Sequence, residues 1–116
     1  MVELTITVPG TPVSVNHYVK HTRAGRHYVT NEAKAFKEAV AVLAGGRSVS
    51  AQRYEVEIAL HLGKGTRIDA DNAGKLPLDS LVSAGVIHSD AAVDRLVIDK
   101  FRDRENPRTV ITVRAR

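Results

Sequence analysis

The chain has 116 residues, of which 43% are hydrophobic and 26% are charged, and this fits one compact domain with a single core. It contains no Cys, which excludes disulfides, thiolate catalysis, zinc fingers and iron–sulfur clusters and suits a reducing cytoplasm. No run approaches the roughly 18 apolar residues of a membrane span, and the sequence opens on a strand pattern, so we expect neither membrane insertion nor secretion.

The first predicted strand covers residues 2–8, where Val, Leu and Ile alternate with Glu and Thr. Pro9 and Gly10 end it. Residues 11–29 then show no period, and they contain three of the five His and three cations without any acid. We expect this segment to form a long basic loop or an irregular hairpin.

A helix is predicted over about 31–44. Thr30 is placed to cap its first turn, and Glu32 suits the positive end of the helix dipole. Apolar residues recur at helical spacing from Phe36 to Leu43, and a pair of glycines follows, which is typical of a helix end.

Alternation of apolar and polar residues predicts a second strand over 54–62. The triplet 63–65, Gly-Lys-Gly, ends this strand; it lacks the rest of a nucleotide-binding fingerprint and is interpreted as a turn. A short helix is expected next, ending at Gly85. It should begin near residues 73–76, because Pro77 is tolerated only in a first turn.

Two further strands are predicted over 93–102 and 109–115, joined by a turn at 104–107. The predicted order is therefore β-α-β-α-β-β. We interpret residues 1–116 as a single α+β domain in which two helices accompany a mixed sheet.

Asp69 and Asp71 are the first candidates for chemistry. In an extended segment residues two apart point to the same side, so both carboxylates could converge on one point. Asp90 follows the turn after the second helix and could return to the same place. Such oxygen ligands suit Mg²⁺, which supports phosphodiester hydrolysis by activating water and neutralising charge on the phosphate. The alternative is that the two acids only cap a helix.

Lys75 lies four residues after Asp71 and four before Asp79, so the three would share one face of a continuous helix. One interpretation is an ordinary ion pair between helix neighbours. The other places the ammonium beside the carboxylates, where it could contact the scissile phosphate and stabilise its transition state.

The basic segment has a composition that suits contacts with a nucleic-acid backbone. The whole chain carries 17 Lys and Arg against 13 Asp and Glu, a formal charge of +4, with basic ends and an acidic middle. Cations release counterions from phosphates and aromatic rings stack on bases, although a solvated loop can have the same composition. The His residues lack partners for a zinc site, and no serine-nucleophile motif occurs. The residues concerned are His17, Tyr18, Lys20, His21, Arg23, Arg26, His27 and Tyr28.

Two stretches carry a resemblance to a known family. The first is Pro12-Val13-Ser14-Val15-Asn16-His17-Tyr18, which follows the first strand. The second is Asp69-Ala70-Asp71-Asn72-Ala73-Gly74-Lys75, continuing to Asp79, Leu81 and Asp90. It matches the pattern Asp-x-Asp-Asn-x-x-Lys-x-x-x-Asp-x-Leu with a later Asp. In these motifs and their order, most of the chain resembles the RusA-like Holliday junction resolvases, small endonucleases of bacteria and phages.

The resemblance implies a RusA-like fold and a homodimer that cuts opposing strands of a four-way DNA junction, with Mg²⁺ as cofactor and Mn²⁺ as a substitute. Asp69, Asp71 and Asp90 would bind the metal and catalyse, together with Lys75. Family members often have an acidic pair at the last motif, whereas Ser89 precedes Asp90 here. The residues expected to hold the DNA backbone are Asn16, His17, Tyr18, Lys20, Arg23, Arg26 and Arg67.

Two other functions fit the same residues. One is a non-catalytic DNA-binding accessory module, in which the acids cap a helix. The other is a debranching nuclease that acts on flaps and replication forks, and no residue excludes RNA as a substrate. For each of these functions we expect a cytoplasmic protein of a bacterial cell, encoded by the host or by a phage.

Overall fold

The computed structural model describes residues 1–13, 19–21 and 27–116. The 3₁₀ turns η2 (Ala70–Asn72) and η3 (Asp90–Ala92) directly precede α2 and β5. The helices and strands are, in chain order, β1 (Glu3–Pro9), β2 (Val19–His21), β3 (His27–Val29), α1 (Asn31–Ala44), β4 (Tyr54–Leu62), α2 (Lys75–Ser83), β5 (Val93–Arg102) and β6 (Arg108–Ala115).

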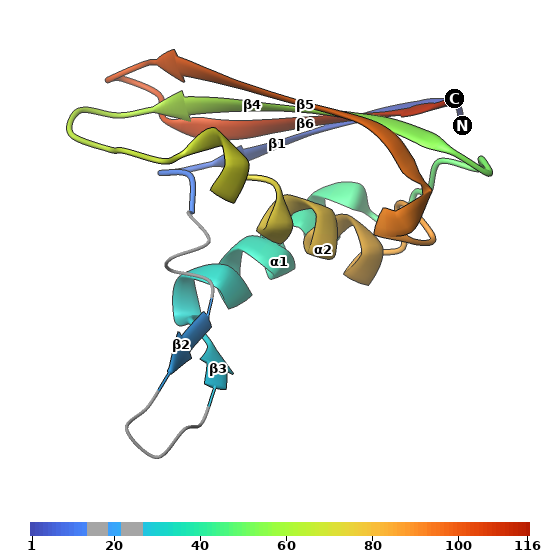
Figure 1. Ribbon diagram of the computed structural model, residues 1–116, viewed down its shortest axis with the longest axis horizontal. Coiled ribbons are helices and arrows are strands. Elements are labelled where there is room, and N and C mark those ends of the chain that lie inside the picture. The colour runs from blue at the N-terminus through green and yellow to red at the C-terminus, as the bar shows by residue number, and fades with distance from the viewer. Residues whose placement is uncertain (14–18, 22–26) are drawn as a thin grey trace.

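Four strands form one mixed sheet in the order β1-β6-β4-β5 (Figure 1). β6 pairs antiparallel with both β1 and β4, whereas β4 and β5 run parallel. β2 and β3 form a separate antiparallel pair, which lies beyond the helices on the side away from the sheet. The mixed sheet with α1 and α2 confirms the predicted α+β class.

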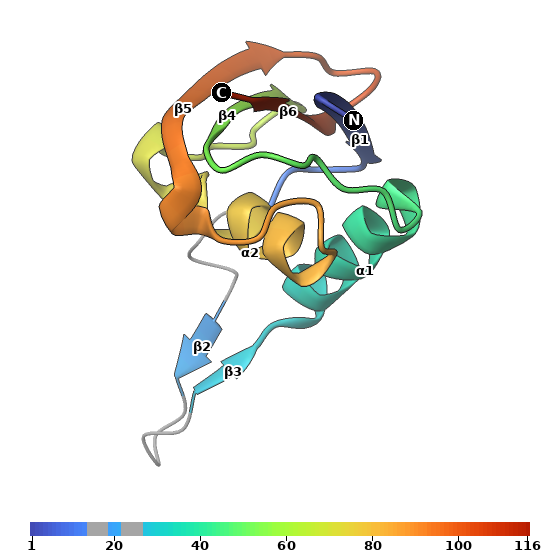
Figure 2. The ribbon, with the colours of Figure 1, turned by 90° about the vertical axis from the view of Figure 1, so that its right-hand side faces the viewer.

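α1 and α2 cover one face of the sheet (Figure 2). Alternate residues of β4, from Tyr54 to Leu62, point into the layer between sheet and helices and are 2% exposed or less. The Thr30 side chain accepts a hydrogen bond from the Ala33 N–H and so caps α1 as predicted. Gly45 ends α1 with a left-handed backbone (φ 60°), which glycine adopts without strain.

The boundaries expected from periodicity agree with the structure for β1, α1, β4, α2, β5 and β6. β2 and β3 are absent from the predicted order, although the hairpin alternative for residues 11–29 allowed for them. Three-residue strands are too short to show a period, so an aperiodic segment could not reveal them.

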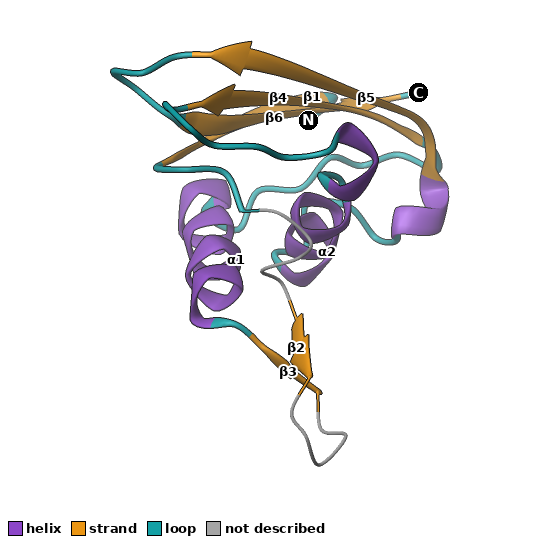
Figure 3. Cartoon of the chain, turned by 60° about the vertical axis from the view of Figure 1, so that its left-hand side comes forward, coloured by secondary structure: helices purple, strands orange, loops and turns teal. Residues whose placement is uncertain are grey.

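The parallel pairing of β4 and β5 brings two loops together. Leu62 at the end of β4 is in register with Arg102 at the end of β5. Figure 3 shows both arrowheads at the same end of the sheet, so the loops that follow β4 and β5 begin side by side. Among the described residues, no helix combines the length and apolar character needed to cross a membrane.

Candidate functional site

The loop that joins β4 to α2 carries the first two candidate aspartates, and it runs back along β5. Arg102 Nη1 donates a hydrogen bond to the Thr66 carbonyl (2.8 Å). Two residues earlier on β5, Lys100 Nζ donates to the Ile68 carbonyl (3.0 Å). Charged donors strengthen such bonds, so β5 fixes the path of the loop up to the first aspartate.

Gly74 fixes the other end of this loop. A Cβ at this position would lie 3.2 Å from Leu96 Cδ2 and 3.3 Å from Ile98 Cδ1, so glycine permits the close approach to β5. α2 begins at the next residue, Lys75, which places Pro77 in the first turn. The missing N–H of Pro77 therefore costs no helical hydrogen bond, and the predicted start of this helix is confirmed.

Asp69 and Asp71 are both exposed and flank Ala70 at the start of η2. The Asn72 N–H donates to the Asp69 carbonyl (3.0 Å), and the Ala73 N–H donates to the Ala70 carbonyl (3.2 Å). Asp69 has an extended backbone (φ −73°, ψ 134°), as expected. The expectation of an extended segment is wrong at Asp71, because the chain already turns into the 3₁₀ conformation there. Period-two alternation therefore does not direct the two carboxylates to one side.

The geometry does not support helix capping as the role of these acids. The Asp69 side chain makes no capping hydrogen bond in η2, and the N-cap of α2 is Gly74. In the part of the chain that the structure describes, no hydrogen bond or ion pair engages the carboxylates of Asp69, Asp71 or Asp90. Other aspartates do pair with cations: Asp79, Asp94 and Asp103.

Lys75 forms an ion pair with Asp79, the residue one helical turn further along α2. Lys75 Nζ lies 3.3 Å from Asp79 Oδ1; the lysine side chain is 60% exposed and the aspartate side chain 22%. The predicted shared face therefore exists for these two residues. It does not extend to Asp71, because η2 and α2 are separate elements and α2 begins only at Lys75.

Asp90 begins η3, just before β5. The Ser89 side chain accepts a hydrogen bond from the Ala91 N–H (3.1 Å) and so caps this turn. Asp90 lines a hollow of about 330 Å³ together with Asp79 and with Lys37 of α1. The fold thus brings Asp90 to the aspartate that pairs with Lys75, a link between the two ends of the motif that the sequence did not indicate.

The donor chemistry of the three candidate aspartates suits Mg²⁺. Their exposed carboxylates offer hard oxygen ligands, and Mg²⁺ is usually held by one or two carboxylates with water completing its shell. Across the residues the structure describes, no group of three or more His, Asp and Glu side chains is gathered closely enough to hold a metal ion. The structure therefore provides suitable ligands without an assembled three-aspartate site.

Most of the predicted DNA-contacting residues of the basic segment lie outside the described residues. Lys20 lies in β2, in register with Tyr28 of β3. Arg67 is exposed on the loop after β4. The predicted residues outside the described part are Asn16, His17, Tyr18, Arg23 and Arg26.

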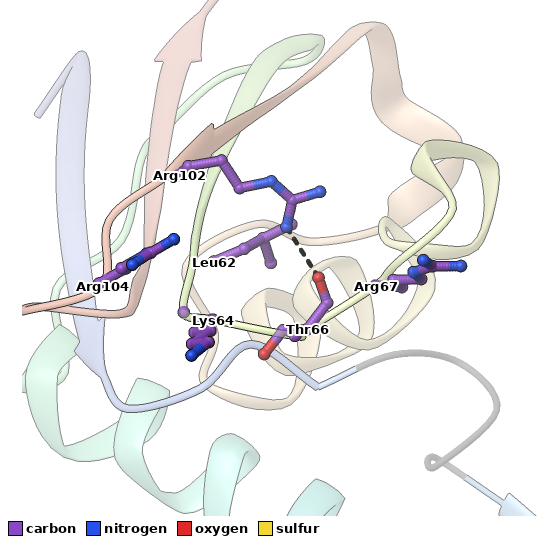
Figure 4. A pocket seen from close by; sticks show the side chains of 8 residues that line it. Leu62, Lys64, Thr66, Arg67, Arg102 and Arg104 are labelled. Carbon is purple, nitrogen blue, oxygen red and sulfur yellow. Dashed lines mark hydrogen bonds between the residues drawn. The ribbon is translucent and has the colours of Figure 1, made fainter.

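Arg67 lines a second hollow, of about 290 Å³, with three cations that the sequence did not single out. Lys64 comes from the turn after β4, while Arg102 and Arg104 come from the end of β5 and the turn beyond it. Figure 4 shows Arg102 reaching the Thr66 carbonyl, with Lys64 and Arg104 on one side of this bond and Arg67 on the other. Only the pairing of β4 with β5 joins these cations, and residue patterns do not reveal that pairing.

Arg53 and Arg114, at the opposite end of the sheet, are neutralised by carboxylates. Arg53, just before β4, forms an ion pair with Asp94, whose pKa is lowered chiefly by the hydrogen bond from this guanidinium. Arg114 contacts Glu3 and Glu57, and the hydrogen bond with Glu57 is the main cause of its raised pKa. These pairs neutralise the guanidinium groups of Arg53 and Arg114, so their role is structural.

Comparison with known proteins identifies the family. The family model described as Endodeoxyribonuclease RusA matches residues 9–114, nearly the whole chain, and this range includes both hollows and all the candidate aspartates. A search of the curated proteins found no match. The chain belongs to the RusA endodeoxyribonuclease family.

Proposed function

We propose that the protein is a Mg²⁺-dependent endonuclease that resolves four-way DNA junctions by paired incisions. The family match carries this proposal, because it covers Asp69, Asp71, Lys75 and Asp90 in one continuous range. The three aspartates are exposed and, among the described residues, unengaged by protein cations, which leaves their oxygens available to a ligand.

In this proposal Asp69, Asp71 and Asp90 hold the metal, for which Mn²⁺ can substitute. Bound Mg²⁺ would supply an activated water and neutralise charge on the phosphate. The ammonium of Lys75 contacts the scissile phosphate and stabilises the charge that develops on its oxygens. Its ion pair with Asp79 limits where this ammonium can reach.

The substrate is branched DNA, and the active form is a homodimer. Opposing strands of a junction are cut symmetrically only if two identical sites face them, and a twofold dimer provides this arrangement. Backbone contacts come from Lys20 and Arg67 and from the remaining predicted residues of the basic segment. Sedimentation analysis tests the dimer directly, because the chain mass is 12.6 kDa.

The decisive experiment incubates the protein with a labelled immobile four-way junction in Mg²⁺, in Mn²⁺ and in EDTA, beside a linear duplex of the same sequence. The same reactions are run with Asp71→Asn, which replaces the negatively charged carboxylate of a proposed metal ligand by a neutral amide and removes no cation. We expect paired nicks at the branch point that require both a divalent metal and Asp71, while junction binding persists in the variant.

The other outcomes distinguish the alternatives. Tight junction binding with no incision in any divalent metal would indicate the non-catalytic DNA-binding module. Preferential cutting of flaps and forks would indicate the debranching nuclease. Loss of both binding and cleavage in a folded Asp71→Asn variant would contradict the proposal that the carboxylates act in catalysis and the cations bind DNA.

A further inference from the structure

The hollow at the ends of β4 and β5 concentrates positive charge. Its lining contains four cations and no acid. The cations are Lys64, Arg67, Arg102 and Arg104, and the rest of the lining is Leu62, Gly63, Gly65 and Thr66. A lining of this kind attracts anions. It can bind an external anion only if carboxylates of the protein do not already form ion pairs with its cations.

In the part of the chain that the structure describes, no carboxylate neutralises these four cations. The ion pairs of the described residues engage Arg53, Lys75, Arg95, Arg108 and Arg114 instead. Arg102 donates to the Thr66 carbonyl, a neutral acceptor that leaves the net charge of the guanidinium unbalanced. The structure thus separates its cations into a neutralised set and a set that remains available.

Asp103 lies between Arg102 and Arg104 in the sequence, yet its carboxylate is occupied elsewhere. Arg108 Nη1 donates to Asp103 Oδ2 (2.8 Å), and the Asn106 N–H donates to Asp103 Oδ1 (3.1 Å). This arrangement directs the only acid adjacent to both arginines into the turn between β5 and β6. The two flanking arginines keep their charge for another partner.

The two turns that form the hollow are fixed to each other. The Asp103 N–H donates to the Leu62 carbonyl (2.9 Å), and a Cβ on Gly63 would lie 3.1 Å from the Pro107 ring. The Thr66 N–H donates to the Gly63 carbonyl (3.3 Å) and closes the first turn. The backbone that carries the cations is therefore held in place before any ligand arrives, which lowers the entropy that binding must overcome.

We propose that this hollow is a phosphate-binding site that holds the backbone of bound DNA beside the candidate active site. Like charges held together repel, and a phosphate that enters between them removes this repulsion. Asp69 follows Lys64 by five positions, so their Cα atoms lie within about 18 Å of each other. The hollow and the candidate active site are thus close enough to contact one DNA strand. The inference rests on the proposed function for its ligand.

The test measures how junction binding depends on salt. Lys64→Gln/Arg104→Gln removes two exposed cations that pair with no carboxylate among the described residues, while Arg102 stays in place because it holds Thr66. Binding of a fluorescent four-way junction is followed by anisotropy in EDTA over a series of NaCl concentrations. Each lost phosphate contact should reduce the slope of log K against log salt by about 0.9, and weaken binding in about 0.1 M salt by about eightfold.

A matched control removes the same charge from the neutralised set. Arg53→Gln/Arg95→Gln should retain the wild-type slope, because these arginines pair with Asp94 and Glu55. Circular dichroism and the Tm establish that each variant is folded. Equal slopes for the wild type and the Lys64/Arg104 variant, or an equal loss in both double variants, would overturn the phosphate site.

The failure of this inference is distinguishable from the failure of the proposed function. If the wild type cuts junctions but the slopes are equal, only the phosphate site is wrong. If the wild type binds junctions without cutting them, nuclease activity is wrong, and a reduced slope in the Lys64/Arg104 variant still supports the site. If the wild type binds no DNA, both are overturned.

Discussion

Lys75 Nζ lies 3.3 Å from Asp79 Oδ1, and Asp79 lines the same hollow as Asp90. The lysine at the start of α2 therefore pairs with an aspartate that shares a hollow with Asp90, at the start of η3. We expect Asp79→Asn to lower the rate of junction cleavage by about ten- to a hundredfold, because displacement of a reacting group by about 1 Å can have an effect of this size. Single-turnover cleavage measures the change.

The role of Asp79 in this prediction is to position Lys75, so binding serves as the second measurement. Junction affinity should stay near that of the wild type, and an ion pair of this kind contributes only about 0.2–0.5 kcal/mol to stability. Glu38→Gln on the exposed side of α1 is the control with the same charge change. Wild-type cleavage by Asp79→Asn would show that Lys75 needs no such positioning.

Mg²⁺ should stabilise the wild-type protein if the candidate aspartates bind it. A ligand that binds only the folded chain, present at ten times its Kd, adds about 1.4 kcal/mol, which corresponds to several degrees in Tm. Asp71→Asn should reduce this shift. Asp99→Asn is the control, because it removes the same charge from a position within β5, in register with Ala59, and it should keep the shift. Thermal unfolding with and without Mg²⁺ measures it, and equal shifts for both variants would contradict binding at Asp71.

Gly74→Val should destabilise the fold by about 1–3 kcal/mol, since side-chain atoms placed where Leu96 and Ile98 already press against Gly74 overpack the contact. Urea unfolding measures the loss. Leu96→Ala removes one of the obstructing side chains, so the double variant Gly74→Val/Leu96→Ala should be more stable than the sum of the single effects predicts. Strict additivity would mean that the two side chains do not meet.

Stability should depend on Asp103 at neutral pH and cease to depend on it in acid. The Arg108 guanidinium, followed by the Asn106 N–H, lowers the pKa of this carboxyl in the folded chain. A lowered folded-state pKa means that the stabilisation is present above the unfolded value of about 3.9 and is lost as the pH falls through the folded value.

We therefore expect Asp103→Asn to lower the Tm at pH 7, with a difference from the wild type that shrinks steadily below about pH 4. Glu105→Gln, in the same turn, serves as the control. A Tm difference that stays constant across this acid range would show that the ionised carboxylate of Asp103 does not stabilise the turn.

The regular elements could be predicted because their residues repeat at the period of the structure they form. β4 alternates strictly from Tyr54 to Leu62 and is buried on one face as that pattern requires. The segment 69–74 could not be predicted in the same way. Its 3₁₀ turn depends on contacts with β5 that lie more than twenty residues away in the chain, so local alternation gave the wrong geometry at Asp71.

The candidate site likewise contains residues that a local pattern reveals and residues that it does not. Asp69, Asp71, Lys75 and Asp90 could be selected from sequence because they form a spaced motif. The hollow lined by Lys64 and Arg104 could not, since these residues meet only through the parallel register of β4 and β5. Strand pairing between distant segments is a property of the whole fold, and it brings together residues that no local pattern connects.

β5 also forms one edge of the sheet, and ten residues of its backbone border the open side. Such an edge offers unpaired N–H and C=O groups to the strand of another molecule and is a route to aggregation. Charged side chains along an edge discourage this, and β5 carries Asp94, Arg95, Asp99, Lys100 and Arg102. The strand that anchors the loop carrying Asp69 and Asp71 thus also protects the protein from association along its edge. Substitutions that make β5 more apolar should therefore lower solubility before they alter the fold.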